Sequence, residues 1–352
     1  MRILTSLEAL TAATAITLLG GCSDNSAIAP KPMAPQSAGQ SALWRAPAVS
    51  GRMGTLYVSS QSGRRVTSFY ACPARGPIKY VADSAYSVIH IYSGIFNYRA
   101  ECGQITSGSG VHDPYGLYVK TSTHDLYVAN TGDNDILVFH RGQTIPYDTY
   151  TDPTVQYPVD VTVGKDGTVL ASNVFGSNFE RGSISTWIQG ASGGTFVGNF
   201  PMLDYPDGNC ITVRKNGTVY FDEYPAPNGG GLWSVSCPAG VCGAQTQVKG
   251  VSLISPWGMR FDAEDDLVVI DTATQTANTF ELPNPKPSII HLASPYPGAM
   301  AINQLDHHLF VTDDYKRSAT EYLYPSGIVV GIQLVPYNGA PLGVAVDPGP
   351  PR

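Results

Sequence analysis

Short apolar runs separated by turn residues repeat along most of this chain. The clearest repeat begins at Pro114-Tyr115-Gly116 and contains the runs 117–119, 125–130 and 136–139, which predict three short strands joined by tight turns. The opening proline element returns at five later places: Pro158, Pro206, Pro256, Pro297 and Pro341. Subtracting successive proline numbers gives spacings of 44, 48, 50, 41 and 44 residues. A period in the forties, with three or four strands in each repeat, predicts β-propeller blades rather than a solenoid.

A second strand recurs in each repeat and ends in an acid or an amide. It is Asp125–Asn130 in the first complete repeat, and its equivalents are 168–173, 218–223, 266–271 and 308–313. Apolar, β-branched and aromatic residues dominate these runs, as expected of strands buried between neighbouring blades. The pairs Asp166-Gly167 and Asn216-Gly217 precede two of them and suit tight hairpin turns, because they tolerate positive φ.

The first repeat resembles a known group of propellers. The order Pro114-x-Gly116-x-x-Val119, followed by Tyr127-Val-Ala-Asn130, is similar to the NHL-repeat and gluconolactonase/regucalcin-like six-bladed propellers. The resemblance covers roughly residues 55–347 and implies an all-β, six-bladed β-propeller. It implies less about function, because this architecture carries hydrolases, lyases and binding proteins alike.

The last repeat is incomplete, which predicts how the ring closes. Pro341–Asp347 has the pattern of an innermost strand with no partner strands after it. We expect it to pair with strands from residues 55–106, since closure removes the open sheet edges that favour aggregation. Two runs in that region, 55–60 and 78–83, both resemble the second strand and begin 23 residues apart. Six blades are predicted, and seven are the alternative.

Residues 1–22 have the pattern of a lipoprotein signal peptide. Arg2 precedes a mostly small and apolar run from Ala9 to Leu19, and Leu19-Gly-Gly-Cys22 resembles a lipobox. This predicts lipidation at Cys22, for instance with palmitate; an ordinary cleaved signal or a buried N-terminal helix is the alternative. Residues 23–50, rich in Pro, Ala and Ser, predict a disordered tether to a propeller at 51–352. The expected location is the bacterial cell envelope, anchored to a membrane by the lipid and facing the periplasm or the exterior.

Composition and cysteine content narrow the expected partners. The formal net charge is −7 and charged residues make up 14%, so no nucleic-acid partner is expected, because phosphates require a basic surface. We expect a monomer. In an oxidising compartment, the cysteines other than Cys22 are expected to form two bridges, Cys72–Cys102 and Cys237–Cys242, with Cys210 free and buried. Zinc is the alternative, but no paired C-x-x-C motif supports it.

One face of the ring is the predicted ligand face. In such propellers, the loops that enter the innermost strands and the turns that follow the second strands gather at one mouth of the central channel. The chemically distinctive residues expected there are His112, Tyr115, Asp207, Asn209 and Trp257. The aromatic rings provide apolar area with a polar tip and suit sugars or peptides, whereas packing between blades is their structural alternative.

A divalent-metal site is a second prediction for the same face. Asn173, Glu223, Asp271 and Asp313 end second strands, and carboxylate and amide oxygens are ligands for Ca²⁺ or another divalent cation. In the gluconolactonase-like enzymes that the sequence resembles, such an ion polarises a lactone carbonyl and activates water. The alternative is that these side chains cap turns, as acids repeated in nearly every blade commonly do.

The function expected from the sequence is binding or scaffolding of an unknown ligand or protein partner at the ligand face. A metal-dependent lactonase or esterase of the gluconolactonase type is the alternative from a different class. A lyase is a third hypothesis with less support, because no pair of a histidine and an acid is evident in the sequence.

Overall fold

A computed structural model describes part of the chain. The described residues are 72, 76–94, 101–154, 156–174, 181–190, 193–203, 208–223, 231–283, 286–303, 307–336 and 339–350. The chain divides into two units, Met1–Met53 and Gly54–Arg352, and every described residue belongs to the second. Cys22, the run 55–60 and Asp207 lie outside the described residues, so the lipidation of Cys22 stays a prediction.

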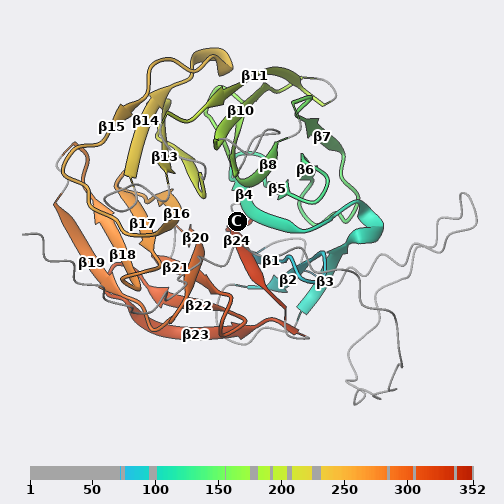
Figure 1. Cartoon of the computed structure of the whole chain (residues 1–352). Coiled ribbons are helices and arrows are strands. Elements are labelled where there is room, and N and C mark those ends of the chain that lie inside the picture. Colours follow the sequence, from blue (N-terminus) through green and yellow to red (C-terminus); the bar gives the residue numbers. More distant parts are fainter. Residues whose placement is uncertain are drawn as a thin grey trace, which may run out of the picture. The chain divides into compact units, whose positions relative to one another are not determined.

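The described residues form six four-stranded antiparallel sheets, which are arranged as blades around a common centre (Figure 1). The first blade comprises β24 (Pro341–Asp347), β1 (Ile78–Asp83), β2 (Val88–Ser93) and β3 (Glu101–Thr106). The second comprises β4 (Pro114–Lys120), β5 (Asp125–Asn130), β6 (Asp135–Phe139) and β7 (Asp148–Thr151). The third comprises β8 (Tyr157–Val163), β9 (Thr168–Val174), β10 (Ser183–Ile188) and β11 (Thr195–Pro201).

The other three blades follow the same order from the centre outward. The fourth comprises β12 (Ile211–Val213), β13 (Thr218–Glu223), β14 (Gly231–Ser236) and β15 (Thr246–Gln247). The fifth comprises β16 (Pro256–Phe261), β17 (Leu267–Asp271), β18 (Thr276–Phe280) and β19 (Pro287–His291). The sixth comprises β20 (Pro297–Asn303), β21 (His308–Asp313), β22 (Ser318–Leu323) and β23 (Ile328–Leu334).

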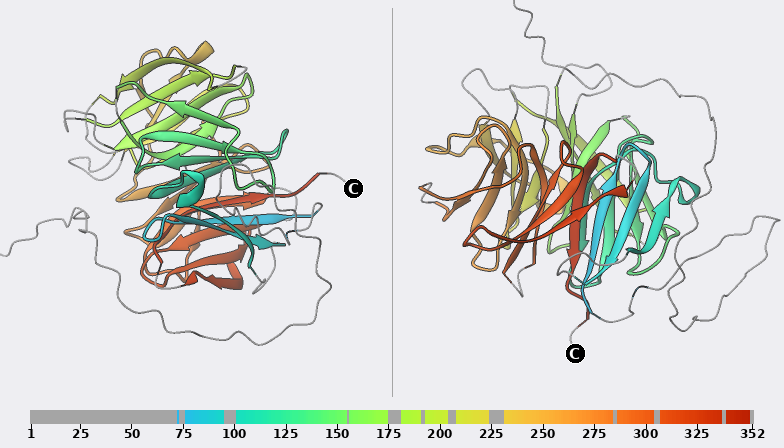
Figure 2. Two further views of the ribbon diagram at one scale, coloured as in Figure 1. Left: turned by 90° about the vertical axis from the view of Figure 1, so that its right-hand side faces the viewer. Right: turned by 90° about the horizontal axis from the view of Figure 1, so that it is seen from below.

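The first blade closes the ring as predicted. β24 pairs antiparallel with β1, with Ile78 opposite Asp347 and Ala82 opposite Gly343, so the innermost strand of this blade comes from the C-terminal end of the chain. In the side views, β24 runs along the ring axis beside the early strands (Figure 2). The number of blades is six rather than seven, and the run 78–83 is a second strand of the first blade.

The innermost strands all begin at one end of the ring, which we call the entry end. The structure explains why the Pro-x-Gly element at this end contains glycine. A Cβ atom added at Gly116 would lie 2.5 Å from the Cα atom of Asp160 on the next innermost strand. A Cβ atom at Gly258 would lie 3.0 Å from the Gly298 carbonyl oxygen, and one at Gly343 would collide with the Tyr115 carbonyl oxygen. Glycine therefore lets neighbouring innermost strands approach backbone to backbone.

Apolar side chains fill the spaces between blades. Between the second and third blades, for example, the Trp187 ring packs edge-on against Tyr150, with ring centroids 6.2 Å apart. Polar links cross the same boundaries: Thr131 donates a hydrogen bond to the Pro158 carbonyl oxygen, and Thr272 donates one to that of Pro297. The boundaries between the second and third blades and between the fifth and sixth thus combine apolar contact with hydrogen bonding.

Both predicted disulfides are confirmed. Cys72 is bonded to Cys102, and Cys237 to Cys242, while Cys210 is free and buried. The helical segments in the described residues are two short 3-10 turns, η1 (Ser107–Ser109) and η2 (Pro238–Gly240). Within this part of the chain, no helix has the length and apolarity needed to cross a membrane.

Candidate functional site

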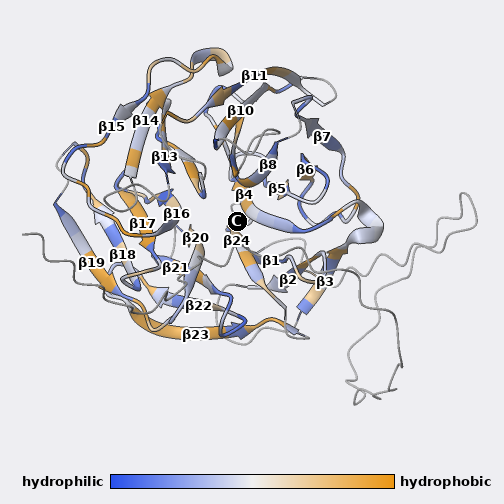
Figure 3. Ribbon diagram, viewed as in Figure 1, coloured by the Kyte–Doolittle hydropathy of each residue, from blue (hydrophilic) through white to orange (hydrophobic). Residues whose placement is uncertain are grey.

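An axial cavity opens at the end of the ring where the innermost strands terminate, which we call the exit end. Its volume is about 880 Å³, and residues from all six innermost strands or the turns directly after them line it. The wall residues fall into matching positions of the repeat, one aliphatic or aromatic side chain from each strand: Val119, Val163, Val213, Phe261, Ile302 and Val346. Strands near the centre of the ring, such as β4 and β24, carry apolar segments (Figure 3). The cavity is therefore the exit half of the central channel, with a largely apolar wall.

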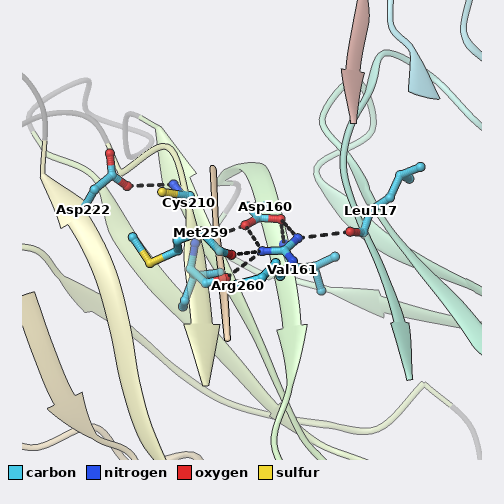
Figure 4. Close-up of polar contacts among 8 residues, drawn as sticks. Leu117, Asp160, Val161, Cys210, Asp222, Met259 and Arg260 are labelled. Carbon is cyan, nitrogen blue, oxygen red and sulfur yellow. Dashed lines mark hydrogen bonds and ion pairs between the residues drawn. The ribbon is translucent and has the colours of Figure 1, made fainter. Parts of the chain in front are cut away.

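A buried ion pair spans the channel at the inner limit of this cavity. Arg260 of β16 reaches across to β8, where its two terminal nitrogens each lie 2.9 Å from an oxygen of Asp160 (Figure 4). The same guanidinium donates hydrogen bonds to the carbonyl oxygens of Leu117, Ile211 and Met259. It therefore contacts four of the six innermost strands.

The surroundings of Arg260 keep its guanidinium charged and bound to Asp160. Burial lowers the pKa of Arg260, but the opposing charge and hydrogen bonds of Asp160 outweigh burial and raise it. Asp160 also accepts hydrogen bonds from the backbone N–H groups of Val161 and Ile211. Because the charges cancel and both terminal nitrogens of Arg260 already donate hydrogen bonds, the pair offers no free charge to a ligand in the cavity.

Lysines stand at the opposite limit of the cavity, around its exit mouth. Lys120 is the last residue of β4, and Lys165 and Lys215 lie in the turns that follow β8 and β12. Lys120 donates a hydrogen bond to the Gln189 side-chain oxygen at 3.0 Å, and Lys215 donates one to the Ala263 carbonyl oxygen at 3.0 Å. Both acceptors are neutral, and the ion pairs within the described residues include none of these three lysines. Their positive charges are therefore not neutralised by a direct partner.

The turn after β16 gives the mouth a second, acidic side. It contains Asp262, Glu264, Asp265 and Asp266, and the Asp265 carboxylate accepts a hydrogen bond of 2.7 Å from Arg214. Asp262 lines the cavity and accepts a hydrogen bond from the Tyr324 hydroxyl. The uncompensated positive charge is thus confined to the second, third and fourth blades.

A smaller cavity adjoins the first between the third and fourth blades. Its volume is about 500 Å³, and it shares Gly164, Lys165, Val213 and Lys215 with the axial cavity. Lys165 and Lys215 therefore stand where two hollows of the exit end meet.

The four predicted metal ligands lie in four different blades. Asp271 accepts hydrogen bonds from the backbone N–H groups of Ile254, Ser255 and Ala273. Asp313 accepts hydrogen bonds from the Ser294 hydroxyl and the Lys316 N–H group. Both arrangements are those of turn-capping carboxylates.

The other two predicted ligands are also held by hydrogen bonds, Asn173 within its own blade and Glu223 from the segment after β11. Asn173 donates from its side-chain nitrogen to Ser183 and Ser185, and Glu223 accepts a hydrogen bond of 3.1 Å from the Leu203 N–H group. Among the described residues, no group of three or more His, Cys, Asp or Glu side chains is placed to hold a metal ion. The Ca²⁺ site stays a prediction from the sequence.

At the predicted ligand face, the structure brings together a pair that the sequence did not reveal. The His112 ring nitrogen Nδ1 lies 2.5 Å from a carboxylate oxygen of Asp133, and both side chains are nearly half exposed. The backbone N–H group of His112 also bonds to the Asn130 side chain. Asp133 lies in the turn after β5 and is not among the residues predicted from the sequence.

The remaining ligand-face residues lie apart in different environments. Burial, together with Asp113 and Asp314, raises the pKa of Tyr115 to about 12. The Trp257 ring lies beside Gly298 of the neighbouring blade, which is the packing role expected as its alternative. Asn209 contacts the buried Asp222, whose carboxylate accepts a hydrogen bond from the Cys210 N–H group at 2.7 Å. Burial raises the pKa of Asp222 to about 7.

Sequence reasoning missed Asp160 and Arg260 as a channel element. One signal was present: Asp160 stands where Pro-x-Gly repeats carry glycine. Arg260 likewise interrupts an apolar strand between Met259 and Phe261. Either departure from the repeat could have identified a buried charged pair, although neither shows which residue is the partner.

These features define the class of the molecule. It is a six-bladed β-propeller with a cavity at one end of its channel and, inside the channel, the ion pair of Asp160 and Arg260, which we call the crossbar. No family model matches the chain, and no curated protein matches it in sequence.

Solved structures share the fold. A chain of a nidogen/laminin complex superposes with a TM-score of 0.60 at 13% identity, covering 77% of this chain and 98% of that one. A functionally unknown protein from Desulfotomaculum acetoxidans gives a TM-score of 0.54 at 13% identity, covering 78% and 99%. A catalytically inactive virginiamycin B lyase from Staphylococcus aureus, determined with quinupristin, gives 0.50 at 14% identity, covering 76% and 85%. At such identities the likeness shows the fold alone.

Proposed function

We propose that this protein is a lipid-anchored, extracytoplasmic binding protein whose ligand occupies the axial cavity. The observation that carries the proposal is the cavity itself, because all six blades line one cavity of about 880 Å³. Small-molecule sites in proteins have about 300–1,000 Å³ and a largely apolar lining with a few polar groups. The lipobox at Cys22 and the two disulfides support an envelope location.

A ligand screen by thermal shift, repeated with a cavity-filling variant, tests the binding role. Ile302 is half buried and lines the cavity, so Ile302→Trp places an indole inside it. Ligands that stabilise the wild-type protein but not the folded variant support the proposal. Ligands that stabilise both equally bind elsewhere and count against it.

The anchor is tested separately. Labelling of the wild-type chain by a radioactive fatty acid, and loss of label in Cys22→Ser, is the expected result. Label that persists in Cys22→Ser would place the lipid on another residue or exclude the lipobox as its signal.

A second candidate, an enzyme that uses acid–base chemistry at the entry end, rests on the His112–Asp133 pair. A carboxylate bonded to one imidazole nitrogen orients the ring, which suits a general base or acid. One protein with a similar fold is a lyase. Activity of the wild-type protein that is lost in both His112→Asn and Asp133→Asn would favour this candidate, whereas axial ligands unaffected by either change favour binding.

A further inference from the structure

We propose that the ligand of the axial cavity is an amphipathic monoanion: a carboxylate or similar group on a hydrocarbon or aromatic body. This inference rests on the proposed binding function and adds the chemical class of the ligand.

The wall favours an apolar body. Each innermost strand contributes one aliphatic or aromatic side chain to the lining, and Thr162, Thr212 and Asn303 add polar groups. Burial of apolar ligand surface favours binding. A chain or ring of carbons fits the apolar part of this wall.

The inner limit of the cavity does not favour an anion. The positively charged residue at this limit is Arg260. Its terminal N–H groups already donate hydrogen bonds to Asp160 and to three carbonyl oxygens. A ligand anion beside it would face the Asp160 carboxylate as well. The apolar end of the ligand therefore points inward, toward the crossbar.

The mouth favours the anion, and on one side only. Lys120, Lys165 and Lys215 project three ammonium groups that lack a direct anionic partner, although the protein as a whole carries a net charge of −7. An ammonium group has three donors and keeps capacity after one hydrogen bond. A carboxylate at this rim would gain charge-assisted hydrogen bonds while its body remains in the cavity.

The acidic turn after β16 limits the charge that the ligand can carry. Glu264 is exposed and Asp262 lines the cavity, and this turn lies beside Lys215, which donates to the Ala263 carbonyl oxygen. A second negative charge next to this turn would therefore meet carboxylates. Arg214 does not relieve this, because Asp265 already binds it. A single anionic group close to the second and third blades would be attracted by the lysines and would avoid the carboxylates of the acidic turn.

Calorimetric titration with octanoate and with octanol tests the ligand class. The protein is the full chain carrying Cys22→Ser, which avoids detergent that would compete for an apolar cavity. We expect octanoate to bind at least about tenfold more tightly than octanol, since three lysines add roughly 1.4 kcal/mol at a half-exposed rim. The combined variant Lys120→Gln/Lys165→Gln/Lys215→Gln should remove this difference and leave octanol binding unchanged.

Matched variants separate the ligand class from the binding function. Lys249→Gln removes one positive charge from an exposed loop before β16, at the entry end, and should leave octanoate binding within about twofold of wild type. Ile302→Trp should abolish binding of both probes while the circular dichroism spectrum stays that of the folded protein.

Each outcome has one meaning. Equal binding of octanoate and octanol, or full octanoate affinity in the triple lysine variant, overturns the anion. If octanoate does not bind but other compounds bind in a way that Ile302→Trp blocks, the ligand class is wrong and the binding function stands. If no compound shows sensitivity to Ile302→Trp, the binding function itself fails.

Discussion

The same six innermost strands touch at the entry end of the ring and separate at the exit end. At the entry end, glycines such as Gly116 and Gly343 let one backbone lie directly against the next. At the exit end, Val163, Ile302 and their equivalents hold the strands apart around a cavity of about 880 Å³. Small residues therefore close one mouth of the channel, and branched residues leave room at the other.

The proposed binding site lies on the face that the sequence did not favour. The sequence placed its candidates on the entry loops, where acids and aromatics are abundant. Those acids largely cap their own turns, as Asp271 and Asp313 do. The strand ends and turns at the exit end look plainer in sequence, yet they supply the three lysines around the cavity mouth.

The crossbar between the two ends should give the largest effect on stability. Asp160→Asn leaves the buried Arg260 charge without its counter-charge, and loss of one partner of such a pair costs about 3 kcal/mol or more. Urea unfolding measures the loss. The control is Asp265→Asn, which breaks the more exposed pair with Arg214 and should cost less than about 1 kcal/mol. Similar losses in both variants would show that the channel pair has no special role.

Backbone contact at the entry end should give the next largest effect. An added methyl group in Gly116→Ala would lie 2.5 Å from the Asp160 Cα atom, so strands must move apart, at a cost of about 2 kcal/mol. In Gly108→Ala the new Cβ atom would lie 3.6 Å from the Thr106 hydroxyl oxygen, an ordinary contact. The melting temperature should fall clearly for the first variant and little for the second. A well-tolerated Gly116→Ala would contradict the close approach.

A buried carboxyl near the entry end should make stability depend on pH. Because burial raises the folded-state pKa of Asp222 to about 7, the folded state holds a proton that the unfolded chain releases near pH 4. Its contribution is present at low pH and is lost as the pH rises from about 4 to about 7. The free energy of unfolding is measured at pH 5 and at pH 8 for both proteins. Between these two values, Asp222→Asn should lose less stability than the wild type.

The control for this pH effect lies at the exit end. Asp166 is exposed and caps its own turn, and Asn at that position can accept the same backbone hydrogen bond. Asp166→Asn should keep the wild-type difference between pH 5 and pH 8. An unchanged difference in Asp222→Asn as well would assign the pH dependence to other groups.

The fold could be predicted from the sequence because its signals are local and repeated. Pro114, Gly116 and their equivalents mark each innermost strand, and the unpaired pattern of Pro341–Asp347 implied closure by the first blade. The cavity could not be predicted, since its volume depends on how far strands of different blades separate. Likewise, Asp160 and Arg260 are 100 residues apart in sequence, and neither residue specifies the other.

Variants of the His112–Asp133 pair should have the smallest effect, and they test whether the ligand binds at the entry end or at the exit end. His112 and Asp133 form an exposed pair, so His112→Asn should change stability by less than about 0.5 kcal/mol. If the exit cavity binds the ligand, octanoate affinity should also stay within about twofold of wild type, measured by the same titration. Asp133→Asn is the matched variant. Loss of binding in both, with folding intact, would return the ligand to the entry face, where the sequence placed it, and would leave the exit cavity without a role.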